Sequence, residues 1–294
     1  MAMAGTSTTH VKSELLERLA ALCPVDDATI DVVEAGLVLS ALRRSDLQLA
    51  PYRTHMATLC ADVAARVRDR QAPPDALCDV LANGHGYRGD RETYDDLQNA
   101  DLASVIDRRR GLPVALSLIW LQAARAQGWT CVGVAFPGHF LIQLESDGVR
   151  TILDPFNEGT ALEPADLRRL LKTVHGADAE LRPEYVTALS DHDVLLRLEN
   201  NIKVRQLRSG DSTGATATLQ HMTAIAPDRP ELWFEAGALN AQIDAVGAAC
   251  RAFDRFLAVD AQTPPSQDME VSAARAKARR DATALLRELR RRLN

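Results

Sequence analysis

The sequence has few aromatic residues, few lysines and no long uninterrupted apolar run. Aromatic side chains make up 4% of the 294 residues, and lysine occurs only at positions 12, 172, 203 and 277. Because no apolar stretch is long enough to cross a bilayer, we expect no contact with a membrane. The apolar fraction of 46% and the charged fraction of 25% are typical of a folded globular protein. At this length the chain is expected to hold two modules, or one large domain with an appendage.

The cysteines lack the spacing of a metal site or a disulfide framework. The five residues are Cys23, Cys60, Cys78, Cys131 and Cys250, and no two of them form a Cys-x-x-Cys pair. The sequence also has no His-Glu-x-x-His motif and no glycine-rich phosphate loop. We therefore expect neither a metal nor another cofactor. Scattered thiols fit a reducing cytosol, and residues 1–19 show no signal-peptide pattern, so the expected location is cytoplasmic.

Clustered positive charge is also missing. Forty acidic residues against 34 basic ones give a formal net charge of −6. Proteins that bind nucleic acid through its phosphates present concentrated positive charge, which a chain of this balance does not offer. We therefore expect no nucleic-acid partner.

Helical periodicity dominates the first third of the chain. Between positions 13 and 81 apolar residues recur at three- and four-residue spacing, which predicts four or five helices. The step Pro73-Pro74-Asp75 is expected to end one helix and begin the next. The segment Asn83-Gly84-His85-Gly86 should end that helix, since its residues tolerate positive φ.

A different pattern occupies residues 94–159. An apolar helix is predicted to begin at Pro113, where a missing N–H costs nothing, and to end at Gly128. Three short strands are expected at residues 130–136, 139–145 and 151–153, separated by Pro-Gly and Asp-Gly turns. One buried helix followed by an antiparallel meander predicts an α+β core.

The last third repeats with a period of 34 residues. This shift aligns Ala215 with Ala249 and Leu219 with Phe253. Residues 230–260 have Trp, Gly, Ala and Phe at the spacing of a tetratricopeptide repeat, in which two antiparallel helices approach closely at small residues. The preceding unit matches less well, since it has glutamate at position 199 and lysine at position 203. A closing helix is expected near residues 271–293.

One histidine and one aspartate are candidates for chemistry. His139 follows a Pro-Gly turn, and Asp154 ends the strand fifteen residues later. On adjacent antiparallel strands the two would meet, and the carboxylate would orient the imidazole and raise its basicity. Such a pair also occurs as a purely structural contact, so both interpretations stay open.

Three motifs in this region carry a resemblance to a known family. They read RRRGLPVALSLIWLQAARAQGW, VAFPGHFLIQL and ILDPF. In this order they resemble the bacterial transglutaminase-like proteins of the SirB type, in which a transglutaminase-like core is often followed by tetratricopeptide-like helices. The resemblance extends upstream through residues 86–90 and Tyr94, and it covers most of residues 80–260.

The resemblance implies a mostly helical α+β protein with a transglutaminase- or papain-like core. We expect a helical region at residues 1–93 packed on the core, the core itself at 94–178, and tetratricopeptide-like repeats with a capping helix at 190–294.

The superfamily implies a Cys–His–Asp triad whose nucleophile begins the buried helix. His139 and Asp154 match the other two members. Aligning the helix by Arg125 and its final glycine places the nucleophile at Pro113, where active relatives have Gly-x-Cys. Proline has no nucleophilic atom, whereas a thiol there would be activated by the helix N-terminus and the imidazole. Ser117 lies a turn into the helix and Cys131 on a strand, so neither is expected to replace it.

Two main hypotheses follow for function. The first is a non-catalytic module that recognises a protein or peptide partner, with Arg110, Tyr94, Trp233 and Phe234 as candidate binding residues. The alternative is a hydrolase or acyl transferase in which His139, oriented by Asp154, acts as a general base without a cysteine. A third interpretation, regulation of gene expression through DNA, comes from the resemblance alone and is disfavoured by the acidic charge.

The arginines at positions 108–110 could orient an anionic group of a peptide. The plainer alternative is that they form salt bridges with Asp101, Asp107 or the pair Asp95 and Asp96.

Overall fold

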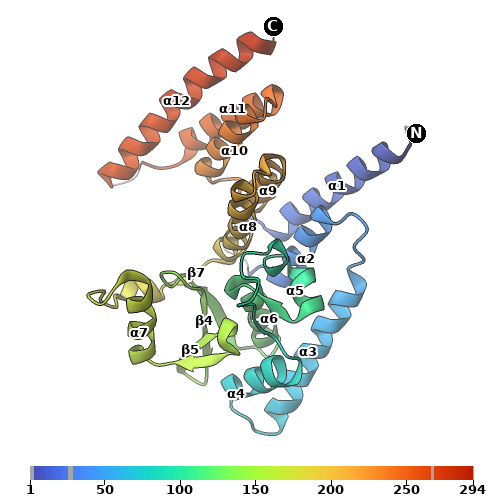
Figure 1. The fold of residues 1–294 in the computed structure, drawn as a ribbon, viewed down its shortest axis with the longest axis vertical. Helices are drawn as coiled ribbons and strands as arrows, with labels where there is room; N and C mark the ends of the chain where they lie inside the picture. Colours follow the sequence, from blue (N-terminus) through green and yellow to red (C-terminus); the bar gives the residue numbers. More distant parts are fainter. Residues whose placement is uncertain (1–2, 26–28, 266–267, 294) are drawn as a thin grey trace. The chain divides into compact units, whose positions relative to one another are not determined.

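The computed structural model describes residues 3–25, 29–265 and 268–293. The chain forms two compact units, which divide between Leu198 and Glu199. Figure 1 shows the order of the elements along the chain. The first unit contains the sheet, and the second is made of helices alone in the part that is described.

Four helices lead into the core, as the periodicity predicts. They are α1 (Met3–Leu22), α2 (Val32–Arg43), α3 (Ala50–Arg68) and α4 (Pro73–Leu77). The predicted start of α4 at Pro73 is confirmed, and a π-helical segment (Cys78–Gly84) continues it. The chain then leaves the helix through Gly86, whose φ of 75° suits glycine.

The sheet has five short antiparallel strands, of which the first four form a meander and the fifth returns to pair with the first. These are β3 (Thr130–Val134), β4 (Leu141–Ser146), β5 (Val149–Asp154), β6 (Thr160–Leu162) and β7 (Ala188–Leu189), in the order β6-β5-β4-β3-β7. The three predicted strands are confirmed. Asp147 and Gly148 both have positive φ, as a two-residue hairpin turn requires. The sequence analysis missed β6 and β7 because strands of three and two residues show no alternation.

The helix α6 (Pro113–Arg125) is the centre of the first unit. Its side chains are buried along almost the whole length of the helix, and Trp120 is fully buried. It packs on β3 and β4, whereas α7 (Pro164–His175) packs its Leu167 and Leu171 on the sheet from the other side (Figure 1). Because helices pack on both faces, the sheet forms the middle layer of an α+β core.

A short parallel ladder leads into α6. It joins β1 (Arg88–Gly89) to β2 (Arg110–Gly111), and α5 (Leu102–Arg108) lies between them in sequence. Single helical turns fill the remaining connections, at Leu97–Asn99, Pro155–Asn157 (η3) and Pro183–Val186.

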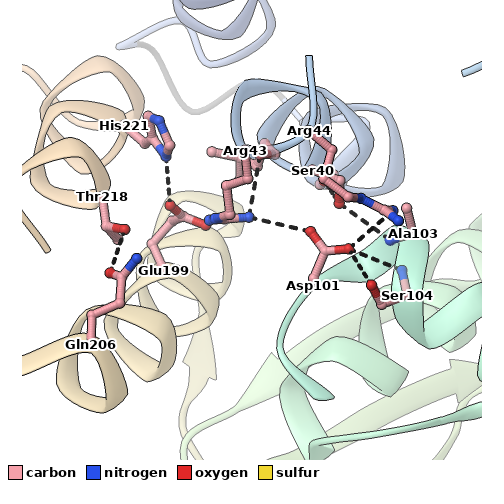
Figure 2. A network of polar contacts seen from close by, with 12 residues as sticks. Ser40, Arg43, Arg44, Asp101, Ala103, Ser104, Glu199, Gln206, Thr218 and His221 are labelled. Atoms are coloured by element: carbon pink, nitrogen blue, oxygen red, sulfur yellow. Dashed lines mark hydrogen bonds and ion pairs between the residues drawn. The ribbon is translucent and has the colours of Figure 1, made fainter. Parts of the chain in front are cut away.

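Asp101 joins α2 to α5 (Figure 2). Its carboxylate caps α5 by accepting from the backbone N–H of Ser104 at 3.0 Å, and it also accepts from Arg44 Nη2 at 3.3 Å. The same two helices meet at Gly36, where an added Cβ would lie 2.7 Å from Leu102. This close contact fixes the helices that support the start of α6.

Arg125 fastens the other end of α6. Its guanidinium donates to both carboxylate oxygens of Asp191, at 2.8 and 2.9 Å, and to the carbonyl of Cys131 at 3.0 Å. Asp191 also accepts from the backbone N–H of Ile30. The side chains of the ion pair are 18% and 9% exposed, so a bidentate pair with little access to water links α6 to three other segments.

A second buried carboxylate holds the loop after β1. Asp90 accepts from the N–H groups of Glu92 and Thr93 at 3.1 and 2.9 Å, and from Arg108 Nη2 at 2.6 Å. Burial alone would raise the pKa of this carboxyl, but the hydrogen bonds from Thr93 and Arg108 lower it to about 2.

The second unit is built from antiparallel helix pairs, as the 34-residue period predicts. Its elements are α8 (Asp191–Arg208, which begins in the first unit), α9 (Ser212–Ile225), α10 (Pro230–Gln242), α11 (Val246–Gln262) and α12 (Met269–Leu293). At Gly237 an added Cβ would lie 2.7 Å from the ring of Phe253, so α10 and α11 approach closely at the predicted small residue.

Buried polar contacts join α8 and α9 (Figure 2). His221 Nδ1 donates to Glu199 Oε2 at 3.0 Å, and Thr218 donates to Gln206 at 2.8 Å. Lys203 Nζ donates to Glu235. The residues at 199 and 203 that depart from the repeat pattern therefore form hydrogen bonds within the unit.

No helix in the described ranges is both long and apolar enough to span a membrane.

We predict that Arg125→Ala lowers the free energy of unfolding by about 3–5 kcal/mol, because it leaves Asp191 buried without its cation. Urea denaturation followed by circular dichroism measures the change. Arg150→Ala is the matched control, since Arg150 pairs with Glu145 at the surface and should contribute less than about 1 kcal/mol. Equal losses in the two variants would contradict the assigned role.

We predict that Asp90 stabilises the fold at neutral pH and that acid removes this stabilisation. Its pKa of about 2 in the folded protein lies below the value of about 3.9 for a free aspartate. The stabilisation is therefore complete above about pH 5 and disappears as the pH falls towards 2. Urea denaturation of the protein and of Asp90→Asn across this range should give a difference that shrinks on acidification. A difference that does not change with pH would refute this prediction.

Candidate functional site

The candidate site forms where β4 begins and β5 ends. His139 follows the turn at Gly138, and Asp154 ends β5 on the neighbouring antiparallel strand. The imidazole Nε2 donates to Asp154 Oδ1 at 2.9 Å, with the side chains 13% and 2% exposed. The two residues that the sequence pairs therefore meet, and their catalytic role stays a prediction.

Asp154 is held by the turn that follows it. Its Oδ1 accepts from the backbone N–H groups of Phe156 and Asn157 at 3.1 and 3.3 Å, and the Asn157 side chain donates to Oδ2. These donors fix the carboxylate, which in turn fixes the imidazole. Because Nε2 is engaged by Asp154, Nδ1 is the ring nitrogen that is left to exchange a proton.

Aromatic and cationic side chains surround the pair. The ring of Phe156 lies edge-on to the imidazole of His139, with centroids 5.9 Å apart, and Tyr94 packs on Phe156 at 6.0 Å. Arg197 donates to the carbonyl of His139 at 3.4 Å. The sequence analysis named Tyr94 as a candidate binding residue, and that role stays a prediction.

Sequence analysis missed Phe156, Asn157 and Arg197. A signal existed for Asn157, since Asp-Pro-x-Asn is a turn sequence in which the aspartate bonds to residues two and three positions later. No local pattern could indicate Arg197, which lies 58 residues after His139.

Pro113 occupies the first turn of α6, as the sequence predicts. It is buried, and the preceding Leu112 is extended, with φ −71° and ψ 158°. The N–H of Leu112 donates to the Asn99 carbonyl at 2.8 Å, which fixes the point where the helix begins. The body of α6 packs against η3, the turn that carries Phe156 and Asn157.

The other candidate nucleophiles have structural contacts. Ser117 is fully buried and donates to the Pro113 carbonyl at 2.8 Å, which is the back-bonding expected of a serine within a helix. Cys131 lies in β3 opposite Leu144, and burial raises its pKa to about 12. A thiol with such a pKa is protonated at neutral pH and is a poor nucleophile.

The three consecutive arginines point to three different partners. Arg108 binds Asp90, Arg109 donates to the hydroxyl of Tyr87 at 2.6 Å, and Arg110 lies 3.4 Å from Glu92. The salt bridges that the sequence analysis considered with Asp101 and Asp107 are not the ones formed. Asp101 binds Arg43 and Arg44, and Asp107 accepts from Tyr52.

Trp233 and Phe234 lie in the second unit. Trp233 Nε1 donates to the carbonyl of Pro227 at 2.9 Å. Phe234 packs edge-on against Phe253 and Phe256, at 5.9 and 5.3 Å, so it belongs to the packing of α10 on α11. Trp233 also lines a groove of about 540 Å³ together with Asn240 on α10 and Arg251 on α11.

In the described part of the chain, no group of three or more His, Cys, Asp or Glu side chains is arranged to hold a metal ion.

Two protein-family models match the chain. The transglutaminase-like superfamily model matches residues 50–200, which is just over half of the sequence, and a tetratricopeptide repeat model matches residues 202–287. No solved structure matches.

Several curated proteins are similar to this chain. A UPF0162 protein of Xylella fastidiosa (strain 9a5c) is 26% identical over 253 residues, which cover 84% of this chain and 90% of that protein. A UPF0162 protein of Vibrio cholerae is 29% identical over 213 residues, which cover 71% and 78%. The F-box only protein 21 of Homo sapiens is 34% identical over 83 residues, which cover 28% of this chain and 13% of that protein. Together with the extent of the family match, the buried helix and the following meander show that this chain belongs to the transglutaminase-like superfamily and carries tetratricopeptide repeats in its C-terminal part.

Proposed function

We propose that the protein is a non-catalytic member of its superfamily that recognises a polypeptide partner. The observation that carries the proposal is the start of α6 at Pro113, which the family pattern aligns with the nucleophilic cysteine. A helix N-terminus lowers the pKa of a thiol and so activates it as a nucleophile. A proline ring has no ionisable atom and cannot be activated in this way. The pair formed by His139 and Asp154 then serves to hold the strands or to line a binding cleft.

The protonation of the cysteines supports this proposal. Burial raises the pKa of Cys23 and of Cys131 to about 12 and that of Cys78 to about 11, and it also raises the pKa of Cys60. The Cys78 thiol donates a hydrogen bond to the Gly159 carbonyl at 3.1 Å. The charged groups near Cys23, Cys60 and Cys78 are carboxylates, and near Cys131 the positive charge of Arg125 does not offset burial. None of these four thiols is therefore activated as a catalytic cysteine is.

The second unit supplies the recognition surface in this proposal. Tetratricopeptide helices bind peptides through surfaces that stacked helix pairs create, and the groove beside Trp233 offers apolar and hydrogen-bonding side chains. We also propose the division predicted from the sequence, in which a helical region at residues 1–93 packs on a core at 94–178. We further propose that the protein is of the SirB type and is cytoplasmic.

A hydrolase or acyl transferase is the second candidate function. It is favoured by the 2.9 Å contact between His139 and Asp154, which orients the imidazole as a general base would be oriented. In such an enzyme His139 Nδ1 would take a proton from water, and no covalent intermediate would form.

We predict that the protein shows no turnover of p-nitrophenyl acetate, or of a glutaminyl peptide offered with a primary amine, above the rate of His139→Ala. A general base contributes about 10²–10⁴-fold, so a functioning one is easily detected. Product release is followed by absorbance and by mass spectrometry, and thermal melting shows whether the variant is folded. Turnover that disappears in a fully folded His139→Ala would overturn the proposal in favour of the enzyme.

A further inference from the structure

A groove rich in arginine lies beside the candidate site in the first unit. It has a volume of about 470 Å³ and lies between the β1 and β2 ladder and the turn after β5. Arg88, Arg91 and Arg110 line it, and we call it the arginine groove. Arg88 and Arg110 are partners in the β1 and β2 ladder, and Arg91 lies in the loop directly after β1.

The floor of the arginine groove is continuous with the surroundings of His139. Phe156 lines the groove and lies edge-on to the imidazole at 5.9 Å, while Asn157 lines it and binds Asp154. Gly89 permits this arrangement, since an added Cβ would lie 2.5 Å from the Phe156 ring. A segment bound in the groove would therefore rest on an aromatic surface and extend towards His139.

The positive charge of the arginine groove is only partly neutralised. Arg91 donates to the side-chain amide of Asn157 and lies 5.7 Å above the Phe156 ring, and both of these partners are neutral. Arg110 meets Glu92 at 3.4 Å, but the Glu92 side chain is 80% exposed, which makes the ion pair weak. In the ranges that the structure describes, no carboxylate pairs with Arg88.

Guanidinium groups select carboxylates by forming two parallel hydrogen bonds. Glu92 and Glu158 also line the arginine groove, so its excess of charge is small and suits a short acidic segment better than a long polyanion. The net charge of −6 on the whole chain favours the same conclusion, since a nucleic acid would meet repulsion beyond the groove. A short segment responds mainly to charges within about 10 Å, the screening length at about 0.1 M salt.

We infer that the arginine groove binds an acidic segment of a partner polypeptide. Glutamate or aspartate side chains of the segment pair with Arg88, Arg91 and Arg110, and an apolar side chain packs on Phe156. The inference rests on the proposed function, because a module that recognises partners without catalysis has to hold a peptide intact. It assigns a recognition site to the first unit, separate from the groove beside Trp233.

The test uses the full-length protein and a fluorescein-labelled peptide of repeated Glu-Gly-Val units, with Gln replacing Glu in the control peptide. Fluorescence anisotropy at low salt should show the acidic peptide binding about tenfold or more tightly than the control, with an affinity that falls as salt is added. The double variant Arg88→Gln/Arg91→Gln and the single variant Arg110→Gln should each weaken binding. Arg150→Gln is the matched control, because this exposed arginine of the same unit lies outside the groove and should leave the affinity unchanged.

Equal affinity for the two peptides, or an equal loss in Arg150→Gln, would overturn the inference. Mass spectrometry of the recovered peptides shows whether the protein has changed them chemically, which distinguishes a failure of the arginine groove from a failure of the non-catalytic proposal. Acidic peptides that bind in the groove but return cleaved would contradict the non-catalytic role and leave the groove intact. Acidic peptides that fail to bind and return unchanged would refute the groove alone.

Discussion

The buried ion pair between Arg125 and Asp191 is the interaction on which the first unit depends. It ties the end of α6 to β3, to the start of α8 and to the segment before α2, all through one guanidinium and one carboxylate. Two fixed points, this pair at one end and the hydrogen bond from Leu112 to Asn99 at the other, set where α6 begins and ends. That register determines which residue occupies the first turn of α6, and therefore which side chain the helix start presents.

The candidate site is held together by contacts that do not depend on a nucleophile. The strands bring His139 and Asp154 together because the meander has short turns, and Asn157 fixes the carboxylate whether or not a reaction takes place. The same turn carries Phe156, which faces both the imidazole and the arginine groove. In the proposed function, the geometry that would orient a base in an enzyme instead presents a peptide-binding surface, and the repeats provide a second one.

Much of this arrangement could be predicted from local patterns. Proline and glycine marked the start of α4, the start of α6 and the hairpin at Asp147, because they restrict or extend backbone freedom in known ways. The repeat period gave the helix pairs of the second unit. Contacts over long sequence distances could not be predicted, as with Asp191 on Arg125 or Arg197 on His139. The expected pairing of the three arginines with Asp101 or Asp107 was wrong for the same reason, since a charge pattern does not say which carboxylate the fold brings close.

Cysteine placed at the start of α6 tests the register directly. We expect the thiol of Pro113→Cys to be alkylated by iodoacetamide at pH 7 about tenfold or more faster than that of Ser117→Cys, because the helix N-terminus and His139 lower its pKa. Ser117 is the matched control, since it lies one turn further along the same helix and is buried. Adding His139→Ala should slow the reaction of the first variant. Equal rates at the two positions, in folded proteins, would show that Pro113 does not occupy the place of a nucleophile.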